Sequence, residues 1–263
     1  MFSKLRSLAK KIVYTLSKQK KHQYNQQVNV EQLVKNFSGR NEQYQYLHHY
    51  FWNLSPDWLR EHRKYFTKER RGFGEDAFHA MWYFIFKEFR PAKVLEIGVY
   101  RGQTISLFTL LSKHFNITSS NIHGISPFTP AGDEVSVYAA SINYYDDVLL
   151  NFKYFNLPDA NLHKGFSTDD AMKEIISNIQ WDLIYIDGNH DYEVAKQDFE
   201  LSAHHLKKGG LIILDDASFN TDFKPPVYAT SGHAGPSKVA AEIDAAQFEE
   251  ILSVGHNRVF KKR

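Results

Sequence analysis

Three aspartates stand at the ends of two apolar segments that read as buried strands. Asp187 lies at the end of the segment 181–188, and Asp215 and Asp216 end the segment 211–216. If the two strands are neighbours in a parallel sheet, their carboxyl ends lie about 5 Å apart. Crowded carboxylates repel one another and raise their pKa values, and a divalent cation relieves this. Oxygen-rich sets suit Mg²⁺, Ca²⁺ or Mn²⁺. The spacing predicts a metal site, although the same side chains could instead cap turns and bond loop amides.

The segment DGNHDYE at 187–193 supplies two further polar side chains beyond the same sheet edge, Asn189 and His190. An imidazole can take up a proton near neutral pH, which makes His190 a candidate general base. The competing interpretation is that His190 bonds to the backbone and shapes the turn. Both interpretations stay open. No H-E-x-x-H or other zinc spacing occurs.

The stretch KVLEIGVYRG at 93–102 reads as a buried strand followed by a turn with two glycines. Gly98 and Gly102 let the backbone approach a ligand closely, and a helix expected at 103–114 points its free N–H groups there. The G-x-x-x-G spacing differs from the G-x-G-x-x-G of dinucleotide-binding proteins. It suits a ligand without phosphates, with a ribose that Glu96 or a neighbouring acid holds. We therefore expect a nucleotide-like cofactor at the carboxyl end of the first strand.

Strands and helices alternate along most of the chain, which is typical of a parallel sheet with right-handed crossovers. We expect an α/β fold with a doubly wound, mostly parallel seven-stranded sheet, built from strands at 94–97, 121–126, 161–165, 181–188, 211–216, 248–254 and 257–261. The helix that begins near residue 191 is expected to stop at Gly209 and Gly210, and Ser167 is expected to cap the helix that follows it. Residues 1–71 are predicted to form a basic, aromatic-rich helical extension, followed by a domain at 72–263.

The composition excludes several kinds of site. The chain of 263 residues has no cysteine, which rules out disulfides, thiolate metal sites and cysteine nucleophiles. The motifs G-x-x-x-x-G-K-[ST] and G-x-S-x-G are absent, so neither a triphosphate site nor a hydrolase elbow is supported. No apolar run reaches the roughly 18 residues that cross a membrane, and the N-terminus lacks the features of a secretory signal. We expect a cytoplasmic protein, with membrane association as an option.

The N-terminal region is strongly basic, whereas the whole chain carries a net charge of only +2. Residues 1–40 hold nine lysines and arginines against one acid, Glu31. Apolar residues recur there at helical spacing with lysines between them, at Phe2, Leu5, Leu8, Ile12, Val13 and Leu16. This predicts a basic amphipathic helix. It is expected to pack on its own domain or on a second subunit, and peripheral contact with an anionic membrane is the alternative. No nucleic-acid-binding module is recognisable, so nucleic acid is not an expected partner.

Taken in order, these motifs resemble those of the class I S-adenosylmethionine-dependent methyltransferases. VLEIGVYRG is similar to their first motif, and KKGGLIILDD is similar to their fifth-strand motif. WDLIYIDGNHDYEVAKQDF resembles the signature of one subgroup. That subgroup includes metal-dependent sugar O-methyltransferases of macrolide biosynthesis and relatives of cephalosporin hydroxylase proteins. The resemblance covers roughly residues 72–262 and does not identify the methyl acceptor.

The resemblance implies a role for each matching position. The residues that would hold the cofactor are Glu96, Gly98, Tyr100, Gly102, Ser126, Ser167 and Asp187. Asp187 would also join Asp215 and Asp216 as metal ligands, with Mg²⁺ as the expected ion, and would lie with His190 or Asn189 at the reacting centre. Ser126 departs from the family, whose members commonly have an acid there that bonds both ribose hydroxyls. A serine can make only a weaker, neutral contact.

The resemblance therefore implies an S-adenosylmethionine-dependent, metal-assisted O-methyltransferase. Its acceptor would be a hydroxyl of a glycan, a glycosylated natural product or another small molecule. His190 is the preferred base, because Asn189 stands where some relatives have an acid. One alternative is a metal-independent methyltransferase. The other is a methyltransferase fold that has lost catalysis and serves as a partner-binding or scaffold protein through the basic arm and the aromatic helices; Ser126 keeps this alternative open. Separately, the N-terminal helices could join two copies into a homo-oligomer.

Overall fold

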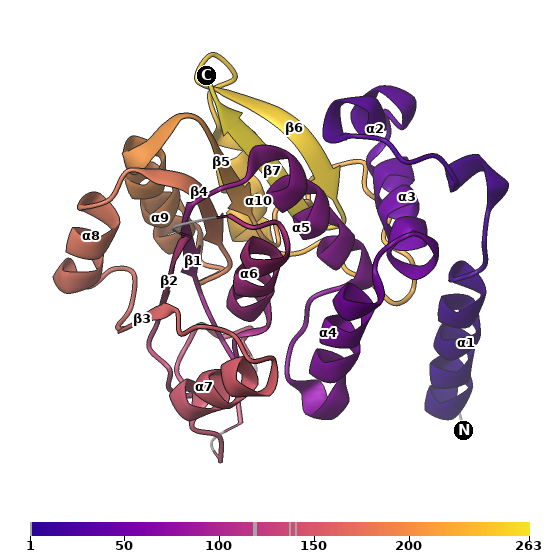
Figure 1. The fold of residues 1–263 in the computed structure, drawn as a ribbon, viewed down its shortest axis with the longest axis horizontal. Coiled ribbons are helices and arrows are strands. Elements are labelled where there is room, and N and C mark those ends of the chain that lie inside the picture. Colours follow the sequence, from indigo (N-terminus) through magenta and orange to yellow (C-terminus); the bar gives the residue numbers. More distant parts are fainter. Residues whose placement is uncertain (1, 118–119, 137, 140) are drawn as a thin grey trace.

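The computed structural model describes residues 2–117, 120–136, 138–139 and 141–263. These residues form a seven-stranded sheet in the order β3-β2-β1-β4-β5-β7-β6 (Figure 1). The strands are β1 (Lys93–Ile97), β2 (Asn121–Ser126), β3 (Asn161–Lys164), β4 (Trp181–Ile186), β5 (Leu206–Leu214), β6 (Phe248–Val254) and β7 (Asn257–Lys262). Strands β1 to β5 pair in parallel, and β7 runs antiparallel between β5 and β6. The predicted α/β class, strand number and mostly parallel pairing are confirmed.

Helices cover both faces of this sheet (Figure 1). One face packs on α5 (Asp76–Phe89), α6 (Gln103–His114) and α7 (Tyr144–Tyr154), and the other on α8 (Asp170–Ser177), α9 (Tyr192–His205) and α10 (Ala234–Glu242). Side chains alternate between the faces of a strand. Accordingly, Leu183 and Tyr185 of β4 join the first buried cluster, and Ile184 and Ile186 join the second. Burial on both faces explains why the central strands are continuous apolar runs.

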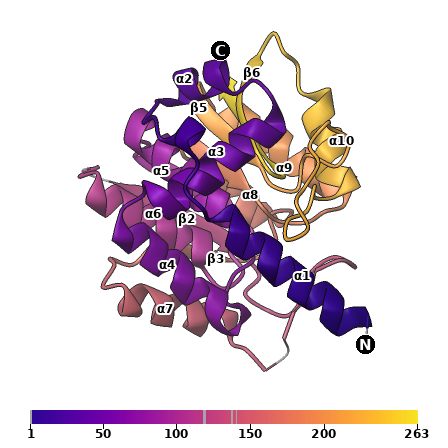
Figure 2. The same cartoon turned by 90° about the vertical axis from the view of Figure 1, so that its right-hand side faces the viewer.

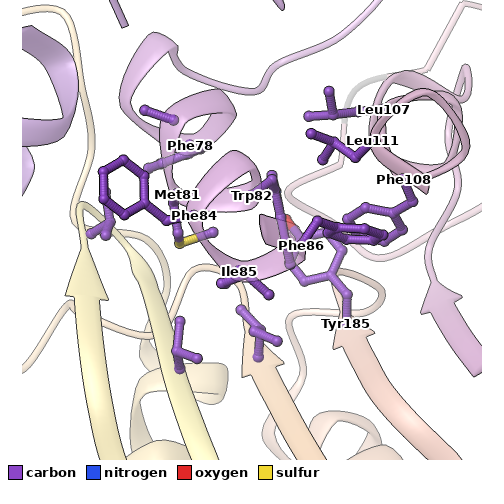
Figure 3. Packing of buried hydrophobic residues seen from close by; sticks show 14 of the residues in the cluster. Phe78, Met81, Trp82, Phe84, Ile85, Phe86, Leu107, Phe108, Leu111 and Tyr185 are labelled. Atoms are coloured by element: carbon purple, nitrogen blue, oxygen red, sulfur yellow. The ribbon is translucent and has the colours of Figure 1, made fainter. Parts of the chain in front are cut away.

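Helix α5 fills the centre of the first layer (Figure 3). Its Trp82 packs edge-on against Phe108 of α6 and Tyr185 of β4, with ring centroids 4.6 and 5.0 Å apart. Such edge-to-face aromatic contacts stabilise a core beyond the area that they bury. This packing holds α5 and α6 against β4, one of the strands whose ends carry the predicted site.

The N-terminal extension is built onto the same layer. Its helices are α1 (Phe2–Ser17), α2 (Val30–Asn36), α3 (Arg40–Asn53) and α4 (Asp57–Thr67), and aromatic side chains of α3 belong to the buried cluster of α5 and the sheet. Gln43 of α3 accepts a hydrogen bond from the Ser253 N–H of β6 at 3.0 Å. Figure 2 shows α1 on the outside of these helices. The predicted boundary at residue 71 thus separates the basic, aromatic-rich sequence from the alternating strands and helices. The helices before the boundary nevertheless pack against α5 and the sheet.

Two local predictions are wrong. Helix α9 ends at His205, and β5 begins at the next residue, so residues 207–210 lie in a strand. The reason is that Leu206 is buried and pairs with Trp181 of β4, which extends the sheet backwards. Ser167 does not cap α8: the N-cap residue is Asp169, and the Ser167 hydroxyl instead donates to Asp198 Oδ2 at 3.0 Å.

A buried histidine pair joins α4, α5 and α6. His62 Nδ1 lies 3.1 Å from His79 Nε2, and His62 Nε2 lies 3.0 Å from Ser106 Oγ. Burial, and to a smaller extent the charge of Arg63, lower the pKa of His62 to about 3. Burial also lowers the pKa of His79. Both imidazoles are therefore neutral in the folded protein at neutral pH.

We expect acid to destabilise the protein partly through His62. Its pKa is lower in the folded state than the ordinary value of 6.5, so the unfolded chain binds the proton first as the pH falls. The stability linked to His62 is complete above pH 6.5 and is lost towards pH 3. In His62→Gln, the decrease in the free energy of unfolding from pH 7.5 to pH 5, measured with urea, should be smaller by about 2 kcal/mol. His204→Gln, at an exposed site on α9, should keep the wild-type pH dependence, and an unchanged dependence in His62→Gln would contradict the prediction.

Candidate active site

The carboxyl ends of the central strands open into two adjoining cavities. The smaller, of about 180 Å³, lies at the ends of β1, β2 and β4. The larger, of about 870 Å³, extends from β1, β4 and β5 towards α5 and α1. Gly98, Tyr100, Asp187 and Gly188 line both cavities. The glycine turn and Asp187 therefore mark the boundary between them.

The residues predicted to hold a cofactor lie around this boundary. Those that line the smaller cavity are Gly98, Tyr100, Ser126, Ser167 and Asp187. Glu96 lines the larger one. Gly102 lines neither cavity; with φ +82° it is the N-cap residue of α6, so its role is to start that helix beside the turn.

Gly98 brings the ends of β1 and β4 into direct contact. Its φ is +99°, and a Cβ placed there would lie 1.8 Å from the carbonyl oxygen of Asp187. The Asp187 N–H donates to the carbonyl of Ile97 at 2.8 Å, and the Gly98 N–H donates to that of Ile125 at 2.9 Å. The missing side chain thus allows the glycine turn and the first carboxylate to share one corner of the site.

The carboxyl groups of Asp187 and Asp215 lie in contact at the ends of β4 and β5. Burial, and then the charge and hydrogen bond of Asp215, raise the pKa of Asp187 well above its usual value. Burial would raise the pKa of Asp215 as well, but the charge of His256 outweighs it and lowers that pKa to about 2. His256 Nε2 lies 3.3 Å from Asp215 Oδ1. The two pKa values thus shift in opposite directions, as expected for carboxylates forced together.

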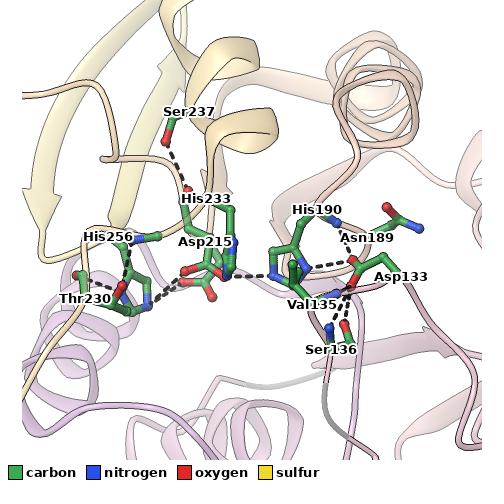
Figure 4. A network of polar contacts seen from close by, with 12 residues as sticks. Asp133, Val135, Ser136, Asn189, His190, Asp215, Thr230, His233, Ser237 and His256 are labelled. Atoms are coloured by element: carbon green, nitrogen blue, oxygen red, sulfur yellow. Dashed lines mark hydrogen bonds and ion pairs between the residues drawn. The ribbon is translucent and has the colours of Figure 1, made fainter.

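His190 lies between two further carboxylates (Figure 4). Its Nδ1 is 2.7 Å from Asp133 Oδ2, and its Nε2 is 2.8 Å from Asp216 Oδ2. The backbone N–H of His190 donates to the same Asp133 oxygen at 2.7 Å, and Asp133 Oδ1 accepts from the hydroxyl of Ser136 at 2.8 Å. Burial lowers the pKa of His190, but the bonds to Asp216 and Asp133 outweigh it and raise the pKa to about 9. The ring is thus fixed in orientation by Asp133.

Groups that could hold a cation cluster at the same edge. Among the residues that the structure describes, two sets bring three ligand atoms within 4.8 Å of one another: Asp215, Asp216 and His256, and His190, Asp216 and His233. Asp187 belongs to neither set, although its carboxyl bonds that of Asp215. The predicted carboxylates are therefore adjacent, and imidazoles accompany them.

Three of these residues were not predicted from the sequence, Asp133, His233 and His256. Asp133 lies 57 positions before its partner His190. The His233 ring centroid lies 4.3 Å from that of His190. His256 stands in the turn between β6 and β7, and pairing of β7 with β5 brings that turn beside Asp215. Of the three, only His256 could have been located from the sequence, because the strands expected at 248–254 and 257–261 leave Gly255 and His256 as the turn between them.

Two further predicted residues have structural partners. The Asn189 side chain accepts a hydrogen bond from the Asp191 N–H at 2.7 Å, which shapes the turn before α9. Ser126 is nearly buried at the end of β2, and its carbonyl accepts from the Gly165 N–H at 3.1 Å. Both residues line the smaller cavity. The acids in the lining of that cavity, within the described part of the chain, are Asp133 and Asp187.

Comparisons with known proteins agree with this architecture. Residues 95–217 match a family model described as a methyltransferase domain. The chain is 27% identical over 158 residues to the uncharacterized protein R132 of Acanthamoeba polyphaga mimivirus. That match covers 59% of this chain and 62% of the relative, so it spans less than two thirds of the relative's length.

Two solved structures have a similar fold. One is the S-adenosylhomocysteine-bound methyltransferase PaMTH1 of Podospora anserina, with a TM-score of 0.54 and 15% identity over 80% of this chain and 89% of that one. The other is a putative caffeoyl-CoA O-methyltransferase of Staphylococcus aureus, with a TM-score of 0.55 and 14% identity over 78% and 91%. At these identities the likeness concerns the fold. Residues 95–217 therefore match a methyltransferase-domain model, and the chain shares the fold of these solved structures.

Proposed function

We propose that this chain is an S-adenosylmethionine-dependent O-methyltransferase that a divalent cation assists. One observation carries the proposal: the glycine turn and Asp187 lie between two cavities, and Asp215, Asp216 and His190 line the larger cavity beside them. We assign the smaller cavity to the nucleoside and the larger one, of about 870 Å³, to a separate acceptor. A site that joins two such cavities suits a transfer between two bound molecules.

The residues present fit the cofactor. Glu96 Oε2 is buried and has no hydrogen-bond partner, and burial raises the pKa of this carboxyl well above its usual value. A donor such as the ammonium group of S-adenosylmethionine would satisfy this oxygen. Ser126 and Ser167 line the smaller cavity, and so does the flat apolar side chain of Phe166. These residues suit the adenosine portion. When bound, the cofactor supplies an electrophilic methyl group, which the acceptor oxygen takes as the sulfur–carbon bond breaks.

The carboxylates fit a divalent cation. Asp187, Asp215 and Asp216 would hold it through oxygen atoms, which suits Mg²⁺. The three carboxyl groups are crowded, which raises the pKa of Asp187, and imidazoles lie beside Asp215 and Asp216; both features indicate that these acids favour positive charge close to them. When bound, the cation lowers the pKa of an acceptor hydroxyl and orients it.

His190 is the base in this proposal. Its Nδ1 is held by Asp133, so the Nδ1 proton stays in place and Nε2 is the atom that accepts a proton. The contact with Asp216 raises the pKa of His190, and positive charge beside that carboxylate would lower it towards neutrality. The proton of the acceptor hydroxyl then passes to Nε2 as the new oxygen–carbon bond forms.

The larger cavity supports a polyhydroxylated acceptor. Its lining combines the charged side chains of Lys10, Arg63 and Glu69 with the aromatic rings of Phe78 and Trp82. Charged groups offer hydrogen bonds to several hydroxyls, and aromatic rings pack on the apolar faces of a molecule. A glycan or a glycosylated small molecule has both features.

The test is isothermal titration with S-adenosylhomocysteine, followed by Mg²⁺. We expect micromolar binding, on the order of −8 kcal/mol, and a further heat when Mg²⁺ is titrated into the complex. Asp215→Asn should remove the Mg²⁺ heat and leave cofactor binding, and Asp170→Asn, an exposed site on α8, should leave both. Absence of S-adenosylhomocysteine binding would refute the proposal. Binding without a Mg²⁺ effect, with turnover that EDTA does not inhibit, would favour the metal-independent enzyme. Binding without turnover on a broad acceptor panel would favour the scaffold alternative.

A further inference from the structure

Helix α1 is attached to the protein through its polar face. The Tyr14 hydroxyl donates to Asp76 Oδ2 at 2.6 Å, and Ser17 Oγ lies 2.9 Å from His48 Nε2. The ammonium group of Lys18 stands 3.8 Å from the ring centroid of Trp52. Tyr14 and Ser17 lie on one side of α1, and Lys18 directly follows the helix, so this side faces the protein.

The opposite side of α1 is apolar and exposed. Its large side chains are 43–55% exposed, at Leu5, Leu8, Ile12, Val13 and Leu16. With 3.6 residues per turn, the stripe of Leu5, Leu8, Ile12 and Leu16 is centred about half a turn away from Tyr14 and Ser17. A surface helix normally buries its apolar stripe against the core. In α1 the orientation is reversed, which leaves the stripe free for another partner.

Charge distinguishes between the partners that could cover this stripe. Arg6, Lys10 and Lys11 are exposed on α1, in a region with nine basic residues and one acid over positions 1–40. A second copy docked across a two-fold axis would face these cations with the same cations, which is unfavourable. A nucleic acid would satisfy the charge but leave the apolar stripe in water. An anionic phospholipid surface satisfies both.

The larger cavity borders α1 and has exposed apolar side chains of its own. Lys10 of α1 is part of the cavity lining, together with Phe73, Val135 and Val227. These three apolar side chains are 50–66% exposed. Among the described residues, no helix combines the length and apolar character needed to cross a bilayer, so contact with lipid would take place at the surface.

We propose that α1 lies in the surface of an anionic phospholipid membrane, with Leu5, Leu8, Ile12 and Leu16 at the acyl boundary and the basic residues at the head groups. Such interfacial helices bind through buried apolar area together with attraction to anionic lipid. The protein would then be held with the larger cavity beside the membrane. This inference does not depend on the methyl-transfer reaction.

The test is flotation of the full-length protein with vesicles of phosphatidylcholine alone or of phosphatidylcholine with phosphatidylglycerol. We expect binding to the anionic vesicles that weakens in high salt, and much weaker binding to the neutral ones. Leu8→Glu and Ile12→Glu should each weaken binding to anionic vesicles about tenfold, because each removes one buried apolar side chain. Arg6→Gln with Lys11→Gln should weaken it and reduce its salt dependence.

Leu150→Glu is the matched control, because Leu150 is a 60% exposed leucine on α7. It should bind vesicles as the wild type does. Equal weakening by Leu150→Glu and Ile12→Glu would overturn the proposal, as would failure of the wild type to bind anionic vesicles. Sedimentation of the wild type as a dimer that Ile12→Glu dissociates, without vesicle binding, would instead assign the stripe to a second copy.

Discussion

A His190→Ala variant is expected to lose methyl transfer by a factor of about 10²–10⁴ and to keep its affinity for S-adenosylhomocysteine. The His190 imidazole lines the larger cavity and can accept the hydroxyl proton, and its orientation is fixed by Asp133 at 2.7 Å. It lines the larger cavity, whereas the nucleoside is expected in the smaller one. The measurement is kcat from release of S-adenosylhomocysteine with an acceptor found for the wild type, together with cofactor titration. Loss of cofactor affinity in this variant would indicate a structural role instead.

The pH profile provides an independent readout of the same prediction. A general base works only when it is deprotonated, so activity should rise with pH through the His190 pKa, which is about 9 with Asp216 and Asp133 alone and lower with a cation beside Asp216. Asp133→Asn removes one of the two carboxylates that raise this pKa, so the rising limb should move to lower pH. It should disappear in His190→Ala. If the rising limb of the pH profile lies at the same pH in Asp133→Asn as in the wild type, His190 is not the base.

Asn189→Ala is the neighbouring control for His190→Ala. The Asn189 carbonyl already accepts a hydrogen bond from the Asp191 N–H at 2.7 Å. Its removal should therefore disturb the turn and lower kcat by less than about tenfold, as loss of one exposed hydrogen bond does. Equal losses in the two variants would transfer the catalytic role from His190 to the turn as a whole.

The fold was predictable because burial on both faces leaves a strong sequence pattern. The runs around Leu95, Ile184 and Ile212 are apolar without alternation, as strands covered on two sides must be. Helix α6 was predicted with its observed bounds, because a glycine precedes it and basic residues end it. The end of α9 was wrong because two glycines usually stop a helix, whereas here the buried Leu206 starts a strand before them. Tertiary pairing outweighed the local signal.

The candidate site was predictable only where its residues end consecutive parallel strands. Asp187, Asp215 and Asp216 are such residues, and the parallel pairing of β4 with β5 makes them neighbours. Asp133 comes from a segment without regular structure, and no spacing in the sequence relates it to His190. His256 reaches Asp215 because β7 inserts between β5 and β6. Two closing strands were expected at 248–254 and 257–261, but not their pairing with β5, so the charge that lowers the pKa of Asp215 could not be foreseen.

Gly98→Ala is expected to lower the free energy of unfolding by about 4 kcal/mol. One contribution is backbone strain at a positive φ, and the other is the steric clash of the added Cβ. With φ +99°, any side chain is strained at this position, and the added Cβ would lie 1.8 Å from the Asp187 carbonyl oxygen. That oxygen belongs to the backbone and cannot rotate away. The ends of β1 and β4 would have to separate, which displaces Asp187 from Asp215 and opens the wall between the two cavities.

Gly209→Ala separates the two contributions. Gly209 has φ +78°, and a Cβ there would meet nothing within 4 Å. This variant should therefore lose only the backbone part, about 1 kcal/mol, and should bind S-adenosylhomocysteine as the wild type does. Urea denaturation gives both free energies of unfolding, and titration gives both affinities. If Gly98→Ala is no less stable than Gly209→Ala, β1 and β4 do not meet at Gly98. The convergence of the glycine turn with Asp187, on which the proposed function rests, would then be lost.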